Sequence, residues 1–158
     1  MTPQFNSMRT LVVEDSKDER VLLRAQLRYV SSVKLLGFVH DGIEAIAYLQ
    51  GDSWFKDREM FPYPDLMLLD FKMPRCDGMD VLDFLRTQFH RPRVILWSTS
   101  LEQINVALAL QAGADLACKK PKDSADLTEI IRRIEAKLSS KARYGSPVLV
   151  TEEAAISG

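Results

Sequence analysis

The segment DLMLLDFKMP, residues 65–74, carries the clearest structural signal in the chain. Its apolar run at residues 66–69 has no polar interruption, which is typical of a strand buried on both faces of a parallel sheet. The run stops at Asp70, so a carboxylate stands where the strand is predicted to end. Pro74 and Gly78 follow in a predicted loop that leads into the next apolar residues.

Four more short apolar runs are predicted to be strands, and most of them are also followed by polar side chains. These runs and the residues after them are 10–13 with Glu14 and Asp15, 33–39 with the turn Asp41-Gly42, 93–97 with Ser98, and 116–119 with Lys120. Segments with helical spacing separate the runs. This alternation predicts an α/β fold: a doubly wound (βα)5 sandwich with a five-stranded parallel sheet and helices on both faces.

The predicted helices carry apolar residues three or four positions apart, which gives each helix one apolar face. Ser16 and Glu19 form a capping-box pattern at the start of the first helix. The apolar positions, helix by helix, are Leu23, Leu27 and Val30; Ile43, Ile46 and Ala47; Leu82, Leu85 and Phe89; Leu101, Ile104 and Leu108; and Leu127, Ile130, Ile131, Ile134 and Leu138. Gly113 is predicted to end the fourth helix. Residues 51–64, which mix charges, aromatics and prolines, are predicted to form an extended loop, with a prolongation of the second helix as the alternative.

Composition limits the class of protein. Of the 158 residues, 46% are hydrophobic and 27% are charged, which is ordinary for a folded domain, and the net charge of -1 argues against general binding of nucleic acid. We find no signal-peptide pattern and no apolar run of about 20 residues, so we expect no membrane span and a cytoplasmic location. We expect residues 1–8 to form a leader, 9–138 the domain, and 139–158 a tail that is disordered or docks through residues 147–151.

The residues that follow four of the predicted strands form one candidate site. If those strand ends share a cleft, it holds the carboxylates of Glu14, Asp15 and Asp70 together with the Ser98 hydroxyl and the Lys120 ammonium. Three carboxylates repel one another, and a Mg²⁺ ion, which prefers oxygen ligands, offsets their charge. A carboxylate beside such a metal can attack phosphorus and form an aspartyl phosphate. Lys120 and Ser98 then offer a counter-charge and a hydrogen bond to the phosphoryl group.

With these residues in place, the sequence resembles the receiver domains of two-component response regulators. The resemblance covers about residues 9–138 and rests on several motifs taken together. They are Val12-Val13-Glu14-Asp15, Leu68-Leu69-Asp70-Phe71-Lys72-Met73-Pro74 with Asp77-Gly78, Ser98, Gln111-Ala112-Gly113-Ala114 and Lys120-Pro121. The strand order 2-1-3-4-5 is implied by this resemblance.

The resemblance also implies a role for each site residue. Asp70 would accept a phosphoryl group from a phosphohistidine on a sensor histidine kinase or a phosphotransfer protein. The Mg²⁺ ligands would be Asp15, Asp70, Glu14 through water, and the backbone carbonyl of Lys72. Ser98 and Lys120 would bind the phosphoryl oxygens, and Ser98 would move toward the phosphate together with the loop and helix that follow it.

Three features depart from the common receiver pattern. Ala117 stands on the predicted fifth strand where many receivers carry an aromatic side chain, so an aromatic–hydroxyl relay is not expected. Residues 51–64 are longer than in minimal receivers. Together with Ser98-Thr99-Ser100 and the C-terminal extension, they resemble stand-alone regulators that serve bacterial phytochrome-type kinases. No DNA-binding unit or catalytic domain follows. We therefore expect a stand-alone receiver that signals to an output partner without binding nucleic acid or membrane, with a homodimer left open.

Two other functions remain open on the sequence. The first is a Mg²⁺-dependent phosphohydrolase with an aspartyl nucleophile, which would usually need a substrate cap and a second, acid–base Asp two residues later, where this chain has Lys72. The second is a degenerate receiver that binds partners without phosphorylation, against which the complete acidic set argues. A signalling domain that catalyses only its own phosphorylation and dephosphorylation is the prediction, rather than an enzyme.

Other distinctive side chains are predicted to be structural. Cys76 and Cys118 are expected to be reduced thiols with no disulfide between them and no metal. Trp97 is expected in the core. For Trp54 two interpretations stay open, a contact with a partner or a cover over the second helix.

Overall fold

The computed structural model describes the backbone of residues 7–144 and the side chains of residues 7–140. Its strands form one parallel sheet in the order β2-β1-β3-β4-β5. They are β1 (Met8–Val13), β2 (Val33–Val39), β3 (Leu66–Asp70), β4 (Arg93–Ser98) and β5 (Leu116–Lys119). The predicted doubly wound fold with strand order 2-1-3-4-5 is confirmed. Most of the predicted leader and tail, including residues 147–151, lies outside the described residues.

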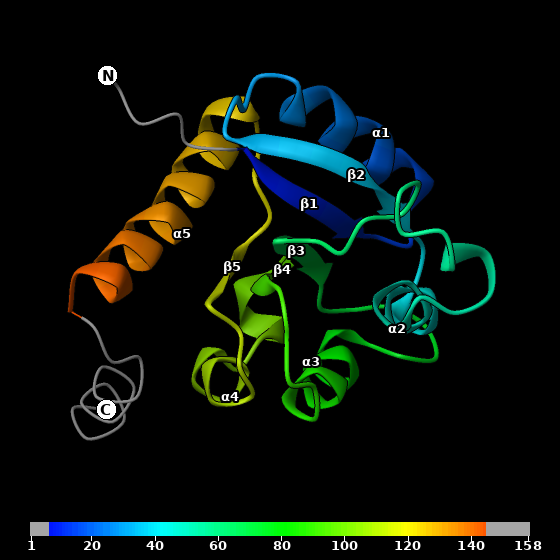
Figure 1. The fold of residues 1–158 in the computed structure, drawn as a ribbon. Coiled ribbons are helices and arrows are strands. Elements are labelled where there is room, and N and C mark those ends of the chain that lie inside the picture. Colours follow the sequence, from blue (N-terminus) through cyan, green and yellow to red (C-terminus); the bar gives the residue numbers. More distant parts are fainter. Residues whose placement is uncertain (1–6, 145–158) are drawn as a thin grey trace, which may run out of the picture.

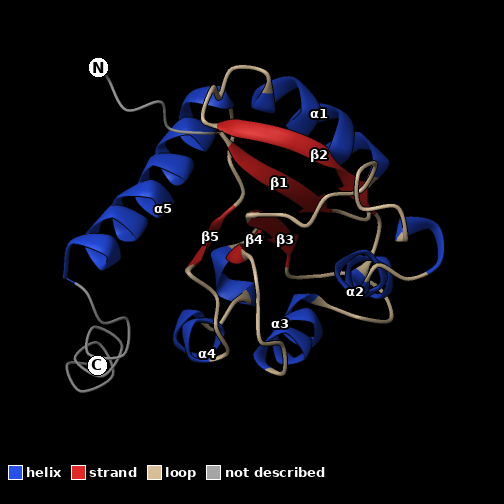
Figure 2. Cartoon of the chain, in the orientation of Figure 1, coloured by secondary structure: helices blue, strands red, loops and turns tan. Residues whose placement is uncertain are grey.

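Helices cover both faces of this sheet (Figure 1). Figure 2 shows the strands as a layer between the two groups of helices. On one face lie α1 (Lys17–Leu27) and α5 (Ser124–Tyr144), and on the other lie α2 (Gly42–Gln50), α3 (Gly78–Arg86) and α4 (Val106–Gln111). Two short 3-10 helices, η1 (Ser53–Phe55) and η2 (Leu101–Gln103), lie in the loops after α2 and β4. Within residues 7–144, no helix combines the length and apolarity that a membrane crossing needs.

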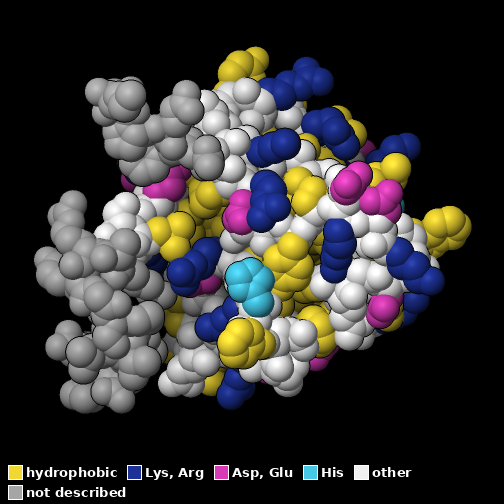
Figure 3. Space-filling view, in the orientation of Figure 1, with side chains coloured by type: hydrophobic (Ala, Val, Ile, Leu, Met, Phe, Trp, Pro, Cys, Tyr) yellow, Lys and Arg dark blue, Asp and Glu magenta, His cyan; other side chains and the backbone are white. Residues whose placement is uncertain are grey.

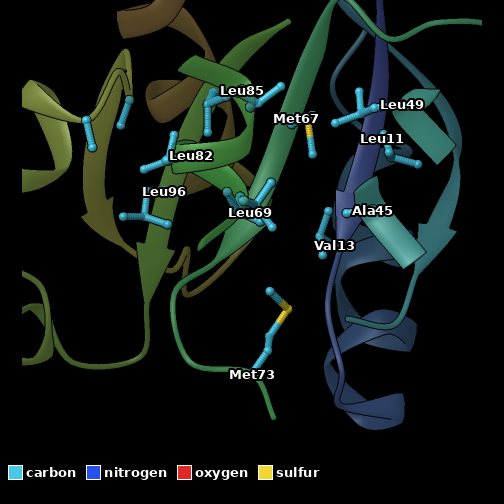
Figure 4. Close-up of a cluster of buried hydrophobic side chains, with 14 of the residues drawn as sticks. Leu11, Val13, Ala45, Leu49, Met67, Leu69, Met73, Leu82, Leu85 and Leu96 are labelled. Carbon is cyan, nitrogen blue, oxygen red and sulfur yellow. The ribbon is translucent and has the colours of Figure 1, made fainter. Parts of the chain in front are cut away.

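The core has two halves, one on each face of the sheet, because successive strand residues point to opposite faces. On β3, Leu66 and Leu68 pack in the half beneath α1 and α5, whereas Met67 and Leu69 pack in the half beneath α2, α3 and α4. Figure 4 shows part of this second half, where side chains of β1, β3 and β4 meet those of α2 and α3. These four apolar side chains of β3 are fully buried, as the uninterrupted apolar run predicts.

The segment after β4 differs from the prediction of one continuous helix. The chain forms η2, becomes extended at Ile104, and starts α4 only at Val106, where the Asn105 side chain accepts a hydrogen bond from Leu108 N at 3.1 Å. Of the three predicted apolar-face residues, Ile104 is buried, but Leu101 and Leu108 are exposed. The spacing of Leu101, Ile104 and Leu108 was therefore wrong as a signal of one helix, because a new N-cap at Asn105 interrupts the segment.

Smaller corrections concern two apolar residues on other segments. Phe89, predicted on the apolar face of the third helix, lies beyond its end at Arg86 and is fully exposed. Trp54 is 85% exposed, so it does not cover α2. Trp97, in contrast, is fully buried in the core as predicted. On the face drawn in Figure 3, acidic and basic side chains are interspersed, in keeping with the net charge of -1.

Candidate functional site

The carboxyl ends of four neighbouring strands meet at one edge of the sheet, and the predicted site residues lie there. Glu14 and Asp15 follow β1, Asp70 and Ser98 end β3 and β4, and Lys120 follows β5. These ends line a cleft of about 240 Å³. Its lining consists of Glu14, Asp15, Ser16, Glu19, Asp70, Lys72, Ser98, Thr99, Gln103 and Lys120. The fold thus brings every predicted site residue into one cleft.

Backbone hydrogen bonds fix the positions of these strand ends. Glu14 N donates to Val39 O at 3.0 Å, which extends the β1–β2 pairing by one residue. Beyond β5, Lys120 N donates to Ser98 O at 2.8 Å. Asp70 and Ser98 are the last residues of their strands, and the backbone pairing continues through Glu14 and Lys120, so these four side chains depart from a rigid edge rather than from a loose loop.

The Asp77-Gly78 pair allows the first turn of α3 to approach the end of β3 closely. A Cβ atom at Gly78 would lie 2.8 Å from the Asp70 carbonyl oxygen and 2.6 Å from Leu96 Cδ1, so no larger residue fits without displacing the backbone. Asp77 caps the helix by accepting from Asp80 N at 3.0 Å. Glycine at position 78 is therefore explained by close packing against the end of β3.

The three acidic side chains form a compact group with different exposure. Glu14 and Asp70 are 1% and 5% exposed, whereas Asp15 is exposed. Each offers one carboxylate oxygen, and these oxygens all lie within 4.8 Å of one another. Two buried carboxylates and one exposed carboxylate at this spacing repel one another strongly unless a cation lies among them.

Lys120 supplies part of that positive charge. Its Nζ atom donates to Glu14 Oε1 at 2.6 Å and lies 3.4 Å from Asp70 Oδ1. It also makes a close ion pair with Glu19 on α1. The predicted capping box is therefore only half formed: Ser16 Oγ accepts from Glu19 N at 3.4 Å, but the Glu19 carboxylate pairs with Lys120 instead of returning to the N-cap.

The pKa values of the clustered groups reflect burial and mutual contact. Burial raises the pKa of Glu14 to about 8, and Glu19 adds to the rise while Lys120 opposes it. Burial also raises the pKa of Asp70, against the attraction of Lys120. For Lys120, burial would lower the pKa, but its hydrogen bonds to Glu14 and Glu19 raise it overall. One ammonium therefore does not fully offset the clustered carboxylates.

The Ser98 hydroxyl is buried and already has a partner. Ser98 Oγ donates to Gln103 Oε1 at 2.9 Å and accepts from Ser100 N at 3.4 Å. Ser98 itself is 1% exposed. The hydroxyl at the end of β4 is thus held by the loop that follows it, before any ligand enters the cleft.

Sequence reasoning missed four lining residues of the cleft, which are Ser16, Glu19, Thr99 and Gln103. For Glu19 a signal existed, because it lies four positions after Asp15, a spacing that can return a helix residue toward the strand end. The capping-box interpretation hid this signal. Gln103 had no such signal, since only the conformation of η2 brings its side chain back to Ser98.

The donor set of the cleft fits a hard divalent cation. Mg²⁺ prefers carboxylate, carbonyl and water oxygens about 2.0–2.1 Å away, so ligand oxygens on opposite sides of the ion lie roughly 4 Å apart. One carboxylate oxygen from each of Glu14, Asp15 and Asp70 lies within 4.8 Å of the other two, so a single ion can lie among them. Lys72, whose backbone carbonyl is the other predicted ligand, also lines the cleft, so the residues present suit such an ion.

Comparison with known proteins gives a consistent family. The profile of the response regulator receiver domain matches residues 10–132. A solved structure of response regulator RPA3017 in red light signaling of R. palustris is 33% identical, has a TM-score of 0.69, and covers 80% of this chain and 90% of its own. Response regulator Rcp1 of Synechocystis sp. is 28% identical over 80% of this chain and 85% of its own length. The Mn(2+)-bound structure of Rcp1 has a TM-score of 0.65 at 26% identity, covering 82% of this chain and 92% of its own.

Other relatives are longer. Protein-glutamate methylesterase/protein-glutamine glutaminase 5 of Myxococcus xanthus is 34% identical over 137 residues, which are 86% of this chain but 36% of that protein. This chain spans 36% to 41% of the length of this relative and two others of the same description.

Proposed function

The chain belongs to the response regulator receiver domain family, and we propose that Asp70 is the residue that accepts the phosphoryl group. The observation that carries this proposal is the position of Asp70: a carboxylate 5% exposed at the end of β3, inside the acidic cleft and 3.4 Å from Lys120 Nζ. We assign the receiver to residues 9–138.

The reaction is transfer of a phosphoryl group between two proteins. A carboxylate oxygen of Asp70 attacks phosphorus, the P–N bond to the donor histidine breaks, and the imidazole nitrogen keeps the electron pair. The transition state spreads charge over the phosphoryl oxygens, so stabilisation depends on positioned cations and donors. Lys120 and the Ser98 hydroxyl are the groups of this chain assigned to those oxygens.

We assign the metal site to Asp15, Asp70 and the backbone carbonyl of Lys72, with Glu14 bound through water and Mg²⁺ as the ion. Bound there, the ion neutralises charge on the phosphoryl oxygens and the carboxylates. The Mn(2+)-bound structure of Rcp1 supports a divalent ion at this kind of site. Asp15 is exposed and offers the most adjustable ligand, whereas Glu14 is fixed by burial and by Lys120.

The proposed partners are a sensor histidine kinase or a phosphotransfer protein as donor and a separate protein as output. The red-light signaling relative points to a kinase of the phytochrome type, and the 51–64 segment, longer than in minimal receivers, agrees with this. We propose that the protein acts in the cytoplasm and signals through its phosphorylation state. A phosphohydrolase is less favoured, because position 72 holds a lysine in place of an acid–base carboxylate.

Intact-protein mass after incubation with acetyl phosphate tests the acceptor. Wild type with Mg²⁺ should gain one phosphoryl group, and it should gain none when the metal is chelated. Asp70→Asn should gain none with metal present, whereas Asp83→Asn, on the exposed side of α3, should behave as wild type. A phosphoryl adduct on Asp70→Asn would place the acceptor elsewhere.

A metal titration tests the ligand assignment separately. Asp15→Ala removes one carboxylate and should weaken Mg²⁺ binding at least 10-fold, roughly the effect of losing one ligand or its close supporting group. Asp18→Ala is the matched control, because Asp18 is also acidic, lies three residues later and does not line the cleft. Equal Mg²⁺ affinity in Asp15→Ala and wild type would show that this carboxylate is not a ligand.

A further inference from the structure

The Ser98 hydroxyl carries a single hydrogen, and this limits what it can do. A serine hydroxyl donates one hydrogen bond and accepts up to two. Its hydrogen is donated to Gln103 Oε1 at 2.9 Å. Donation to Gln103 and donation to a phosphoryl oxygen on Asp70 are therefore mutually exclusive.

Gln103 connects Ser98 to the start of α4. Its backbone N–H donates to Ser100 O at 3.2 Å, and the N–H of the next residue, Ile104, donates to Leu101 O at 3.1 Å. Ile104 is anchored in the core at 6% exposure, and Asn105 caps α4 directly afterwards. The side-chain bond from Ser98 to Gln103 thus closes a loop of backbone bonds that sets the conformation of residues 99–104.

The side chain at position 117 on β5 cannot couple the Ser98 hydroxyl to residues 99–104. Ala117 pairs with Leu96 on β4, and its side chain is a single methyl group that packs against the core beneath α2, α3 and α4. It has no ring to follow a moving hydroxyl and no polar atom to bond it. Gln103, in the segment expected to move, instead contacts the Ser98 hydroxyl with a polar side chain.

We infer that Gln103 is a positioning residue, which holds the Ser98 hydroxyl in the unphosphorylated protein and loses it to the phosphoryl group when Asp70 is phosphorylated. A charged phosphoryl oxygen is a stronger acceptor than an amide carbonyl, by roughly twofold in hydrogen-bond strength, so the exchange favours the phosphoryl group. The release of Gln103 then loosens residues 99–104. This inference rests on the proposed function of Asp70 and Ser98.

Amide hydrogen exchange, measured residue by residue by NMR, tests the inference. In unphosphorylated Gln103→Met, which keeps length without the carbonyl, the amides of residues 103 and 104 should exchange about 2- to 10-fold faster than in wild type, as expected for one neutral hydrogen bond. Gln103→Glu keeps an acceptor oxygen and should keep wild-type exchange. Glu102→Gln, exposed on the same turn, is the surface control and should also match wild type. The Lys120 amide, bonded to Ser98 O, reports that the sheet edge stays intact.

A double-mutant cycle distinguishes a Ser98–Gln103 bond from a general effect on the loop. Ser98→Ala and Gln103→Met should each accelerate exchange at residues 103 and 104, and the double variant should not exceed the larger single effect. Phosphorylated wild type should show the same acceleration as unphosphorylated Gln103→Met. Additive effects, or no acceleration in Gln103→Met, would overturn the inference, as would unchanged exchange in wild type carrying the phosphoryl mass. Absence of that mass would instead overturn the proposed function of Asp70, and the inference with it.

Discussion

Lys120 Nζ lies 2.6 Å from Glu14 Oε1 but 3.4 Å from Asp70 Oδ1, so its ammonium is bound more closely to the proposed metal ligand than to the proposed acceptor. Its third carboxylate partner, Glu19, comes from α1. The Lys120 ammonium therefore already offsets part of the negative charge that a cation in the cleft would offset. Binding of a metal ion and binding by Lys120 compete for the charge of Glu14 and Asp70.

Replacing Lys120 with methionine should strengthen Mg²⁺ binding while slowing phosphorylation. Removing one positive charge near the metal should lower the Kd for Mg²⁺ by about 5-fold or more, since a unit charge at 4 Å is worth about 1 kcal/mol even in water. The phosphorylation rate with acetyl phosphate should fall, because the phosphoryl oxygens lose a counter-charge. Isothermal titration calorimetry gives the Kd, and intact mass gives the rate.

Lys119→Met is the matched control for that variant. Lys119 is the neighbouring lysine and is exposed. Its replacement removes the same charge from the chain but changes no residue that lines the cleft. Its Mg²⁺ affinity should stay close to that of wild type. If both variants bind Mg²⁺ equally, the effect is one of net charge rather than of the contacts that Lys120 makes.

Arg58 should stabilise the long segment between α2 and β3. Its guanidinium donates to the carbonyl oxygens of Tyr48 at 2.7 Å, Leu49 at 2.7 Å and Phe61 at 3.2 Å, so it binds both the end of α2 and the returning loop. Arg58→Met should lower the free energy of unfolding by about 2 kcal/mol, typical for loss of charged hydrogen bonds. Chemical denaturation of the variant and wild type measures this difference in the free energy of unfolding.

The position of Arg58 also explains Gly51, and it supplies the control. A Cβ atom at Gly51 would lie 2.9 Å from Arg58 Nη2, and the backbone there is left-handed with φ +69°. Lys56→Met removes an exposed cation from the same loop and should change the free energy of unfolding by less than about 0.5 kcal/mol. A comparable loss in both variants would mean that the three carbonyl contacts are not what holds the loop.

The fold and most of the site were predictable because strands buried on both faces leave an unambiguous signal. The run 66–69 has no polar residue, and its end at Asp70 coincides with the end of the observed strand. Site residues that follow such strands are placed by the sheet itself. This is why the sequence alone assigns Glu14, Asp70, Ser98 and Lys120 to one edge.

The predictions that failed concern the conformation of the loop after β4 and side chains that turn back from a loop to the preceding strand. The spacing of Leu101, Ile104 and Leu108 imitates one helix, but the cap at Asn105 divides the segment. Gln103 reaches Ser98 from η2, which precedes that cap. Local periodicity does not encode a side chain that turns back to the preceding strand, so such contacts appear only in three dimensions.

The two tryptophans should give separable fluorescence signals. Trp97 is fully buried one residue before Ser98, whereas Trp54 is 85% exposed in the loop after α2. In Trp54→Phe, the emission should shift to shorter wavelength and iodide should quench it several-fold less than in Trp97→Phe. Equal quenching of the two variants would contradict the described burial, and unfolding in guanidinium should abolish the difference.

The ion pair between Asp41 and Arg75 should make part of the stability pH-dependent. Asp41 caps α2 by accepting from Glu44 N at 2.8 Å and also pairs with Arg75. Burial would raise the pKa of Asp41, but the hydrogen bond from Glu44 N and the contact with Arg75 lower it below its ordinary value of 3.8. A depressed folded-state pKa contributes stability that is fully present above the ordinary value and is lost as the pH falls through the lower one.

Asp41→Asn keeps an N-cap oxygen and removes only the charge. At pH 7 it should lower the free energy of unfolding by about 0.5–1 kcal/mol, a modest figure because Arg75 is 69% exposed and screened by solvent. The difference from wild type should shrink as the pH falls below about 4, where unfolded Asp41 takes up a proton. Asp52→Asn is the matched control, because Asp52 stands at the start of η1 without a side-chain cap bond. Urea denaturation from pH 7 to pH 3 would show this convergence, whereas a constant difference would mean that the Asp41 charge contributes nothing and that the amide is simply a poorer cap.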